Sequence, residues 1–447
     1  MYKPLKFLAS AVFACSVASP VLSAELKADI AKDYKTHLAA LFDHFHRNPE
    51  LSGMEVQTAA RLAKELRNAG FEVTEGVGGT GIVAMMKNGP GPLVMMRADM
   101  DGLPVEEKSG LDNASRTRQV DWDGNEVFVM HACGHDVHIT SLVGTARIMV
   151  ARKSQWSGTL MLLGQPAEER INGARGMMGD DLWQRFGQPD YALAFHVSSE
   201  LPVGKLGVTE GSPYSGADTV DIIVPGVGAH GASPHRGIDP VVLGSQIVLA
   251  LQTVISREKA PRYPGVITVG SFQAGSKHNI ISDEARLQLT VRSDEPETRA
   301  LLLAGIERVA VNMGRVAGLP EDNLPRVIVS EESVPATIND AALTRRLSAV
   351  WTEQIAGDVI VGVENRKGMG AEDFPFFTTE PRIASTYFAV GGTPPEDFER
   401  EKAGGAAVPS HHSPLFKISP EPSVSLGVEA TVIALLELLQ KPAQPVQ

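Results

Sequence analysis

The chain has 447 residues, of which 43% are hydrophobic and 21% are charged, proportions typical of a soluble globular protein. Its formal net charge of −12, without a basic stripe, argues against a nucleic-acid partner. The length is sufficient for two domains, and no long apolar run beyond the N-terminal segment indicates a membrane span.

Residues 1–24 have the features of a signal peptide. Lys3 and Lys6 form a basic start, residues 7–18 are apolar, and small residues precede a cleavage point near Ala24. We therefore expect an exported protein, either periplasmic or secreted. Two alternatives stay open: lipoprotein processing at Cys15, and an ordinary buried N-terminal helix.

The next elements alternate between strands and helices. Apolar spacing and turn residues predict helices at 26–46, 56–68 and 138–150, and strands at 81–86, 92–96, 159–164 and 191–197. This alternation predicts an α/β domain built on a mostly parallel sheet. The domain is expected to be discontinuous, comprising 25–211 and 324–447, with a last helix at 424–439.

The order of predicted strands and helices changes between residues 212 and 323. This segment is expected to form an inserted α+β domain, acting as a lid or in dimerisation. Its predicted strands lie at 218–225, 266–272 and 285–292, and its predicted helices at 239–256 and 297–311.

Residues 131–138, HACGHDVH, carry the strongest chemical signal. They place three imidazoles, a thiol and a carboxylate within eight residues, a density that points to metal chemistry. The second cysteine, Cys15, lies in the predicted signal peptide, so Cys133 would be the single thiol of the mature chain. It is therefore read as a metal ligand or a nucleophile, not as half of a disulfide.

Four other polar segments end predicted strands or lie in loops beside the sheet, where α/β enzymes place their chemistry. They are QPAEE (165–169), His196, GMGAEDF (368–374) and HHSP (411–414). We expect them to share one site with residues 131–138.

The chain resembles the M20 metallopeptidase superfamily, and most closely its amidohydrolase branch of hippurate, N-acyl-amino-acid and indole-acetyl-amino-acid hydrolases. The resemblance rests on eight segments in family order: RADMDGLPVEE (97–107), HACGHDVH (131–138), QPAEE (165–169), AFHV (194–197), GAHGASPH (228–235), HNIISDEARLQLTVR (278–292), GMGAEDF (368–374) and HHSPLF (411–416). It implies a catalytic domain of zinc-exopeptidase type and two adjacent divalent metal ions in each subunit.

The resemblance assigns the metal ligands as Cys133, His135, Glu169, His196 and His412. This mixture of sulfur, nitrogen and oxygen donors suits zinc, manganese, cobalt or nickel. His411 is an open alternative to His412. Other nearby side chains are expected to support the site rather than to bind metal: Asp99, His131, His138, Glu372 and Asp373.

The resemblance also assigns catalytic roles. Glu168 matches the general base, and Asp101 would orient His135. His230 matches a histidine that reaches the other subunit's site and polarises the scissile carbonyl, which implies a homodimer. Asn279 and Arg292 match substrate-binding positions.

The implied activity is metal-dependent hydrolysis of the amide bond of an N-acyl amino acid or a small peptide-like amide. A dipeptidase or carboxypeptidase on the same scaffold stays open, as does a non-catalytic metal- or ligand-binding protein.

The connection at residues 111–129 is longer and more polar than is usual in the family. It is expected either to shape substrate entry or to form a surface hairpin with an Asp-Gly turn.

Overall fold

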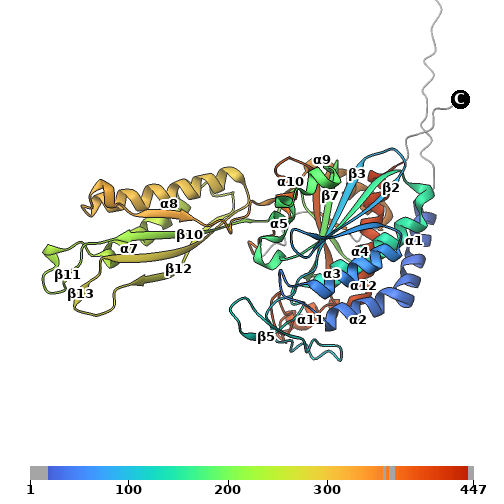
Figure 1. The fold of residues 1–447 in the computed structure, drawn as a ribbon, viewed down its shortest axis with the longest axis horizontal. Helices are drawn as coiled ribbons and strands as arrows, with labels where there is room; N and C mark the ends of the chain where they lie inside the picture. The colour runs from blue at the N-terminus through green and yellow to red at the C-terminus, as the bar shows by residue number, and fades with distance from the viewer. Residues whose placement is uncertain (1–18, 356–358, 362–367, 441–447) are drawn as a thin grey trace, which may run out of the picture.

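The computed structural model describes residues 19–355, 359–361 and 368–440. Figure 1 shows a rounded body and an elongated domain that projects from it; following the expectations above, we refer to them as the catalytic domain and the lid. Residues 1–18 of the predicted signal peptide lie outside the described residues. Helix α1 (Ser19–Asp33) runs through Ala24, where cleavage is predicted.

The catalytic domain is built on an eight-stranded sheet in the order β1-β2-β6-β3-β7-β18-β8-β17. Its central strands β6, β3, β7 and β18 are mutually parallel, and antiparallel pairs flank them. The bounds are β1 Glu72–Val77, β2 Gly81–Asn88, β3 Leu93–Asp99, β6 Gly158–Gln165, β7 Tyr191–Pro202, β8 Leu206–Val208, β17 Val359–Val361 and β18 Ala384–Thr393. The α/β prediction is confirmed.

Helices cover both faces of this sheet, as a buried, largely parallel sheet requires. One face carries the largest apolar core, with α4 (His135–Ala151) and α12 (Pro420–Leu438) packed together at its centre. The other helices of this core are α1, the π-helical turn Tyr34–Leu38, α2 (Ala39–Arg47), α3 (Val56–Asn68) and α9 (Ala341–Gln354). The opposite face carries α5 (Gly173–Gly179), α6 (Leu182–Phe186) and α10 (Pro375–Thr378). The short helix α11 (Pro395–Lys402) buries no residue.

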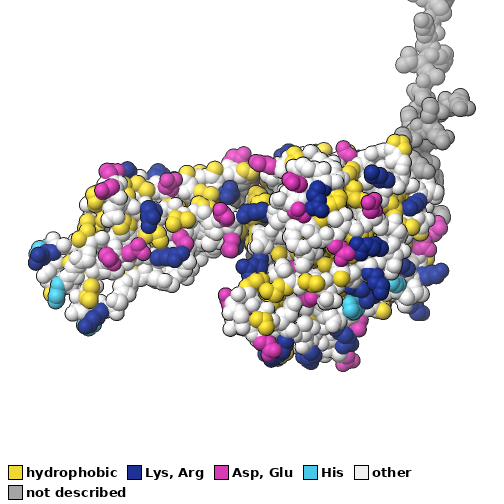
Figure 2. Space-filling model, in the orientation of Figure 1, with side chains coloured by type: hydrophobic (Ala, Val, Ile, Leu, Met, Phe, Trp, Pro, Cys, Tyr) yellow, Lys and Arg dark blue, Asp and Glu magenta, His cyan; other side chains and the backbone are white. Residues whose placement is uncertain are grey.

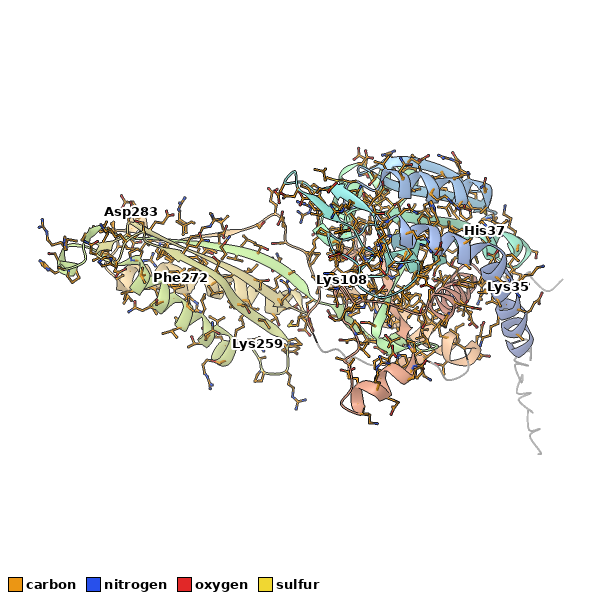
Figure 3. The ribbon with its side chains drawn as sticks, turned by 90° about the horizontal axis from the view of Figure 1, so that it is seen from below. Lys35, His37, Lys108, Lys259, Phe272 and Asp283 are labelled. Atoms are coloured by element: carbon orange, nitrogen blue, oxygen red, sulfur yellow. The ribbon has the colours of Figure 1, made fainter. Side chains whose placement is uncertain are left out.

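The lid has its own four-stranded antiparallel sheet, in the order β12-β14-β10-β15. Helices α7 (Pro240–Thr253) and α8 (Pro296–Val316) pack on it and enclose a separate apolar core. The strands are β10 Gly216–Pro225, β12 Gly265–Ala274, β14 Glu284–Ser293 and β15 Arg326–Val329. Figure 2 shows the hollow between lid and catalytic body on one face, and Figure 3 places Phe272 and Asp283 in the lid, far from His37.

The predicted domain boundary at residue 324 is too early. β15 pairs with β10 and so belongs to the lid. The chain returns to the catalytic domain at β16 (Thr337–Asn339), which pairs with β9 (Gly211–Tyr214). These two strands form the connection between the domains. β15 is short and mostly exposed, so its sequence lacked the apolar alternation that marks a strand.

The far end of the lid carries a small pair of strands, β11 (Ala229–His230) and β13 (Ile280–Ile281). The lid also contains the one helical segment, among the residues described, that is long and apolar enough to cross a membrane, at Pro240–Glu258. Core helices of soluble proteins pass this test as well, and here the segment packs on the lid sheet.

The connection at 111–129 forms the surface hairpin that its Asp-Gly pair predicted. β4 (Arg118–Val120) pairs antiparallel with β5 (Glu126–Phe128). At its tip the Arg170 guanidinium lies 4.2 Å from the ring centroid of Trp122. Because Arg170 directly follows Glu169, the hairpin lies beside the predicted site.

Candidate metal centre

The predicted ligands converge at the edge of the sheet where β3, β6 and β7 end or pass. Cys133 lies in the loop before α4, and His135 is the first residue of that helix. Glu169 lies in a helical turn directly after β6, His196 in β7, and His412 in the loop before α12. Parallel strands bring their carboxyl ends to one edge, which explains the convergence of segments so distant in sequence.

Gly134 makes the close approach of this loop to β7 possible. Its φ of +83° lies in the left-handed region, and a Cβ there would lie 2.4 Å from Cγ1 of Val197. Any other residue would both strain the backbone and push the loop away from β7. The glycine between Cys133 and His135 therefore fixes how both side chains meet His196.

The five predicted ligands form two triads that share one sulfur. The potential ligand atoms of Cys133, His135 and His196 lie within 4.8 Å of one another, as do those of Cys133, Glu169 and His412. These sulfur, nitrogen and oxygen donors could hold divalent metal ions. His135, Glu168 and Glu169 form a further group within the same distance.

Hydrogen bonds set the tautomers of His135 and His196. Nδ1 of His135 donates to the backbone oxygen of Asp101 at 2.9 Å, with the Asp101 carboxylate 3.2 Å away. Nδ1 of His196 donates to the carbonyl of Val197 at 2.6 Å. Each ring therefore presents the lone pair of Nε2 to the site, as a metal ligand must. Nε2 of His135 is buried without a hydrogen-bond partner among the described residues.

His411 and His412 are distinguished by their partners. The backbone N–H of Ser199 donates to Nε2 of His411 at 3.2 Å, so the proton of the neutral ring is on Nδ1. That Nδ1 lies 3.7 Å from the sulfur of Cys133 and can donate to it. Burial lowers the pKa of His411 to about 3, which keeps the ring neutral. His412 instead lies 3.3 Å from Glu169, and its ligand atom belongs to the triad with Cys133 and Glu169.

His138 and Asp99 lie beside the triads, with ligand atoms within 4.8 Å of each other and of His135, and both are engaged in hydrogen bonds. The backbone N–H of Val197 donates to Nε2 of His138 at 2.8 Å, and Nδ1 of His138 donates to Asp99 at 2.5 Å. The second oxygen of Asp99 accepts from Arg97 at 2.6 Å. His131 is buried and joins no ligand cluster among the residues described.

The electrostatic field of the site favours a cation. Burial lowers the pKa of His135, but Asp99, Asp101 and Glu169 outweigh this effect and raise it to about 10. Burial and the carboxylates of Glu169 and Glu168 raise the pKa of the Cys133 thiol well above its ordinary value. A thiolate at this position therefore needs a compensating positive charge, which fits the donor set to divalent metal ions.

Glu168 lies beside the triads in an acidic environment. Its carboxylate groups with those of Glu372 and Asp373. Burial, followed by repulsion from Glu372 and Glu169, raises its pKa well above the ordinary value. Such a carboxyl group is suited to accepting and returning a proton.

Arg97 balances the charge of the Glu372 and Asp373 carboxylates. The buried guanidinium donates to Glu372 at 2.6 Å and lies 3.4 Å from Asp373. Gln165 adds a hydrogen bond to Asp373 at 2.6 Å. Glu372 and Asp373 are thereby held in place beside Glu168, whereas the contacts of Arg97 had no signal in the sequence beyond its place in RADMDG.

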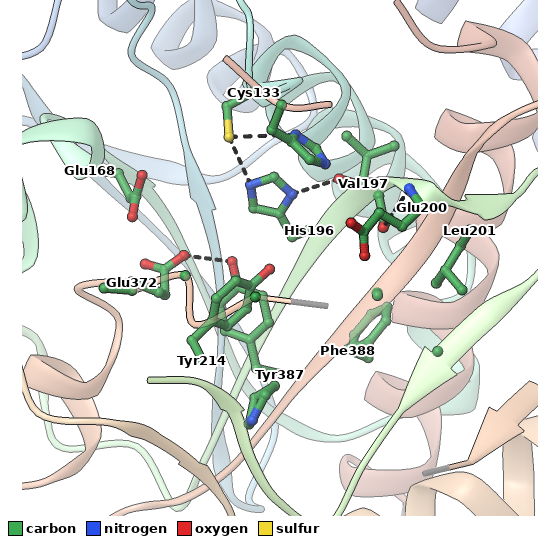
Figure 4. Close-up of a pocket in the computed structure, with 18 of the residues that line it drawn as sticks. Cys133, Glu168, His196, Val197, Glu200, Leu201, Tyr214, Glu372, Tyr387 and Phe388 are labelled. Carbon is green, nitrogen blue, oxygen red and sulfur yellow. Dashed lines mark hydrogen bonds between the residues drawn. The ribbon is translucent and has the colours of Figure 1, made fainter. Parts of the chain in front are cut away.

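A cavity of about 570 Å³ opens over the triads (Figure 4). Its metal end is lined by Cys133, Glu168, His196 and His412, among others. An apolar wall includes Leu201, Val208 and Phe388. Arg292, on β14 of the lid, also lines it and has no carboxylate partner among the described residues. The cavity therefore combines the predicted metal ligands at one end, an apolar wall and the positively charged guanidinium of Arg292.

Two of the predicted site residues, His230 and Asn279, do not line this cavity. They are neighbours at the far end of the lid, where the N–H of Gly231 donates to the carbonyl of Asn279. Asn279 and Arg292, grouped by sequence as one substrate-binding pair, are thus separated along the lid.

Sequence reasoning missed Tyr214 and Tyr387, which line the cavity at its metal end. The hydroxyl of Tyr387 donates to Glu372 at 2.7 Å. Neither tyrosine lies in a segment that carried a chemical signal, so only the packing of β9 and β18 revealed them.

Comparisons with known proteins agree with this site. Residues 95–403 match the model of peptidase family M20/M25/M40. The chain is 33% identical to a hippurate hydrolase of Campylobacter jejuni, over 76% of this chain and 85% of that protein. It is also 33% identical to thermostable carboxypeptidase 2 of Saccharolobus solfataricus, over 87% of this chain and 92% of that protein.

A solved structure shows the same fold. The YXEP protein of Bacillus subtilis, described as a dinuclear metal-binding peptidase of family M20, matches with a TM-score of 0.74 and 26% identity. The match covers 91% of this chain and 99% of the other. On the family match and these relatives, the chain belongs to the M20 peptidase family and is a metal-dependent hydrolase that acts on carbon–nitrogen bonds.

Proposed function

We propose that this protein hydrolyses the amide bond of N-acyl amino acids. The observation that carries the proposal is a pair of triads sharing Cys133, with Glu168 beside them, in a cavity that also holds Arg292. The similarity to a hippurate hydrolase supports this substrate class.

Two divalent ions would be held by the side chains of the two triads: Cys133, His135, Glu169, His196 and His412. Their thiolate, imidazole and carboxylate donors suit zinc, manganese, cobalt or nickel. When bound, such a pair lowers the pKa of water and stabilises negative charge on the substrate. Asp101 and Val197 hold His135 and His196 in the tautomers that can bind metal.

Glu168 performs the proton transfers. It takes a proton from the attacking water as the water oxygen bonds to the carbonyl carbon. The carbon–nitrogen bond then breaks, and Glu168 delivers that proton to the leaving amine. The products are a carboxylic acid and a free amino acid, so no oxidant or other co-reactant is needed.

Arg292 and the apolar wall would bind different parts of the substrate. The guanidinium is suited to a bidentate contact with the carboxylate of the amino acid. Leu201, Val208 and Phe388 provide an apolar surface for the acyl group. The preferred substrate is therefore an amino acid with a free carboxylate and an apolar acyl substituent.

A homodimer would give His230 and Asn279 a role. Both belong to or flank the β11–β13 pair, which lies at the projecting end of the lid (Figure 1), and neither lines the cavity of its own subunit. A partner subunit's lid could bring the same pair to this site. The exported location expected from residues 1–24 belongs to this proposal as well.

Glu168→Gln tests the mechanism. The amide cannot accept a proton, so we expect turnover of N-benzoylglycine to fall to background while metal content, measured by elemental analysis, is unchanged. Glu106→Gln makes the same change on an exposed carboxylate, 45% exposed, and should retain full activity. Near wild-type turnover by Glu168→Gln would refute the assigned role.

A carboxypeptidase or dipeptidase is the second candidate, favoured by the similarity to thermostable carboxypeptidase 2. The two are separated by comparing N-acyl amino acids with unblocked dipeptides on the wild-type protein reconstituted with manganese or zinc. Faster hydrolysis of unblocked dipeptides would replace the proposed substrate class.

A further inference from the structure

Tyr214 lines the cavity at a position that no sequence motif assigned to the site. It ends β9, the strand that leads from the catalytic domain towards the lid. Its side chain lines the cavity together with Cys133, Glu168 and His196 (Figure 4). A residue of the connecting strand therefore reaches the metal end of the pocket within its own subunit.

Packing on several sides fixes the direction of the ring. The rings of Tyr214 and Tyr387 meet edge to face with centroids 5.0 Å apart, and the ring of His196 lies 6.3 Å away. The next residue, Ser215, donates its backbone N–H to the carbonyl of Gly370 at 2.8 Å. A Cβ on Gly370 would lie 3.8 Å from Cδ1 of Tyr214, so a side chain at this position of the loop would contact the ring.

The hydroxyl of Tyr214 is available to a ligand. The neighbouring hydroxyl of Tyr387 is already bonded to Glu372, whereas that of Tyr214 has no hydrogen-bond partner among the described residues. Burial and the Glu372 carboxylate raise the pKa of the Tyr214 phenol well above its ordinary value, so it stays protonated. It can therefore act as a donor but not as a base.

We propose that the Tyr214 hydroxyl donates a hydrogen bond to the oxygen of the scissile carbonyl as negative charge develops there. A donor fixed in advance and aimed at this oxygen stabilises the transition state more than the planar substrate. The contact comes from the same subunit and does not depend on His230 of a second chain. The inference rests on the proposed function, since it names a donor for that reaction.

The test replaces one oxygen atom, in Tyr214→Phe. Two probes are compared by calorimetry on the metal-loaded protein: a phosphinic-acid analogue of N-benzoylglycine, which is tetrahedral at the reacting centre, and benzoate, the planar product. Turnover of N-benzoylglycine and metal content are measured in parallel. Tyr191→Phe is the matched control, because it makes the same change at the start of β7, five residues before His196.

We expect kcat of Tyr214→Phe to fall roughly 100-fold, the loss typical of an oxyanion donor. Affinity for the phosphinic analogue should fall by a similar factor, with KM, benzoate affinity and metal content unchanged. Tyr191→Phe should match the wild type. Unchanged kcat, an equal loss of affinity for both probes, or a loss of metal would each overturn the assignment. If the wild type hydrolyses no N-acyl amino acid, the proposed function fails first and the inference falls with it.

Discussion

Asp101→Asn tests whether the carboxylate behind His135 prepares the metal centre. The Asp101 carboxylate faces three donors: Nδ1 of His135 at 3.2 Å, the hydroxyl of Ser52 at 2.7 Å and the backbone N–H of Glu169 at 3.0 Å. An asparagine amide has only one acceptor oxygen. Whichever way it turns, its NH2 group meets a donor and at least one of these bonds is lost.

The expected loss follows from which bonds remain. A hydrogen bond to a charged group contributes about 1.5–3 kcal/mol, and loss of a residue that orients a metal ligand weakens metal binding by about 10- to 100-fold. The backbone oxygen of Asp101 still accepts from Nδ1 of His135 at 2.9 Å. We therefore expect the lower end of this range, about tenfold weaker metal binding.

The assay is a competition titration of the metal-free protein with zinc and a chelator of known affinity. Ser52→Ala is the matched control, since it removes one neutral donor and leaves the Asp101 charge and its bond to His135 in place. The loss of metal affinity in Ser52→Ala should be smaller than that in Asp101→Asn. Metal affinity of Asp101→Asn within twofold of the wild type would refute this reasoning.

Three further predictions concern the same region. His412→Ala should lower the bound metal from two equivalents towards one, whereas His411→Ala should keep both, as measured by elemental analysis. Equal losses of metal would contradict the choice of His412 as the ligand, which rests on the hydrogen bond from Ser199 to His411. His46→Gln should destabilise the fold by about 3–5 kcal/mol near pH 6, measured by urea unfolding, because it leaves Asp136 and Glu107 buried without their cation. Burial lowers the pKa of His46, but these carboxylates raise it to about 10, above the unfolded value of about 6.5. The difference in the free energy of unfolding between the wild type and His46→Gln should therefore be largest below pH 6.5 and should shrink as pH rises through about 10. A constant difference over that range would be inconsistent with the ion pair.

Much of the fold could be predicted from local pattern. Helix α3 has the bounds 56–68 that its apolar spacing predicted, and the strands that lead to the site lie where short apolar runs end in turns. These elements carry their signal within ten or fifteen residues, which is the range over which periodicity acts. β15 carries no such signal, because pairing with β10 and not its own sequence makes it a strand.

The sequence by itself determined the donor types and their order along the chain. The thiol, imidazoles and carboxylates of the predicted ligands are properties of residue identity, and the structure brings all five together. Tertiary structure alone decided what each neighbour does. Ser199 sets the tautomer of His411, Tyr214 turns into the cavity, and Asn279 lies apart from Arg292. These outcomes depend on contacts between segments hundreds of residues apart, such as that between Cys133 and His411, and no local pattern encodes them.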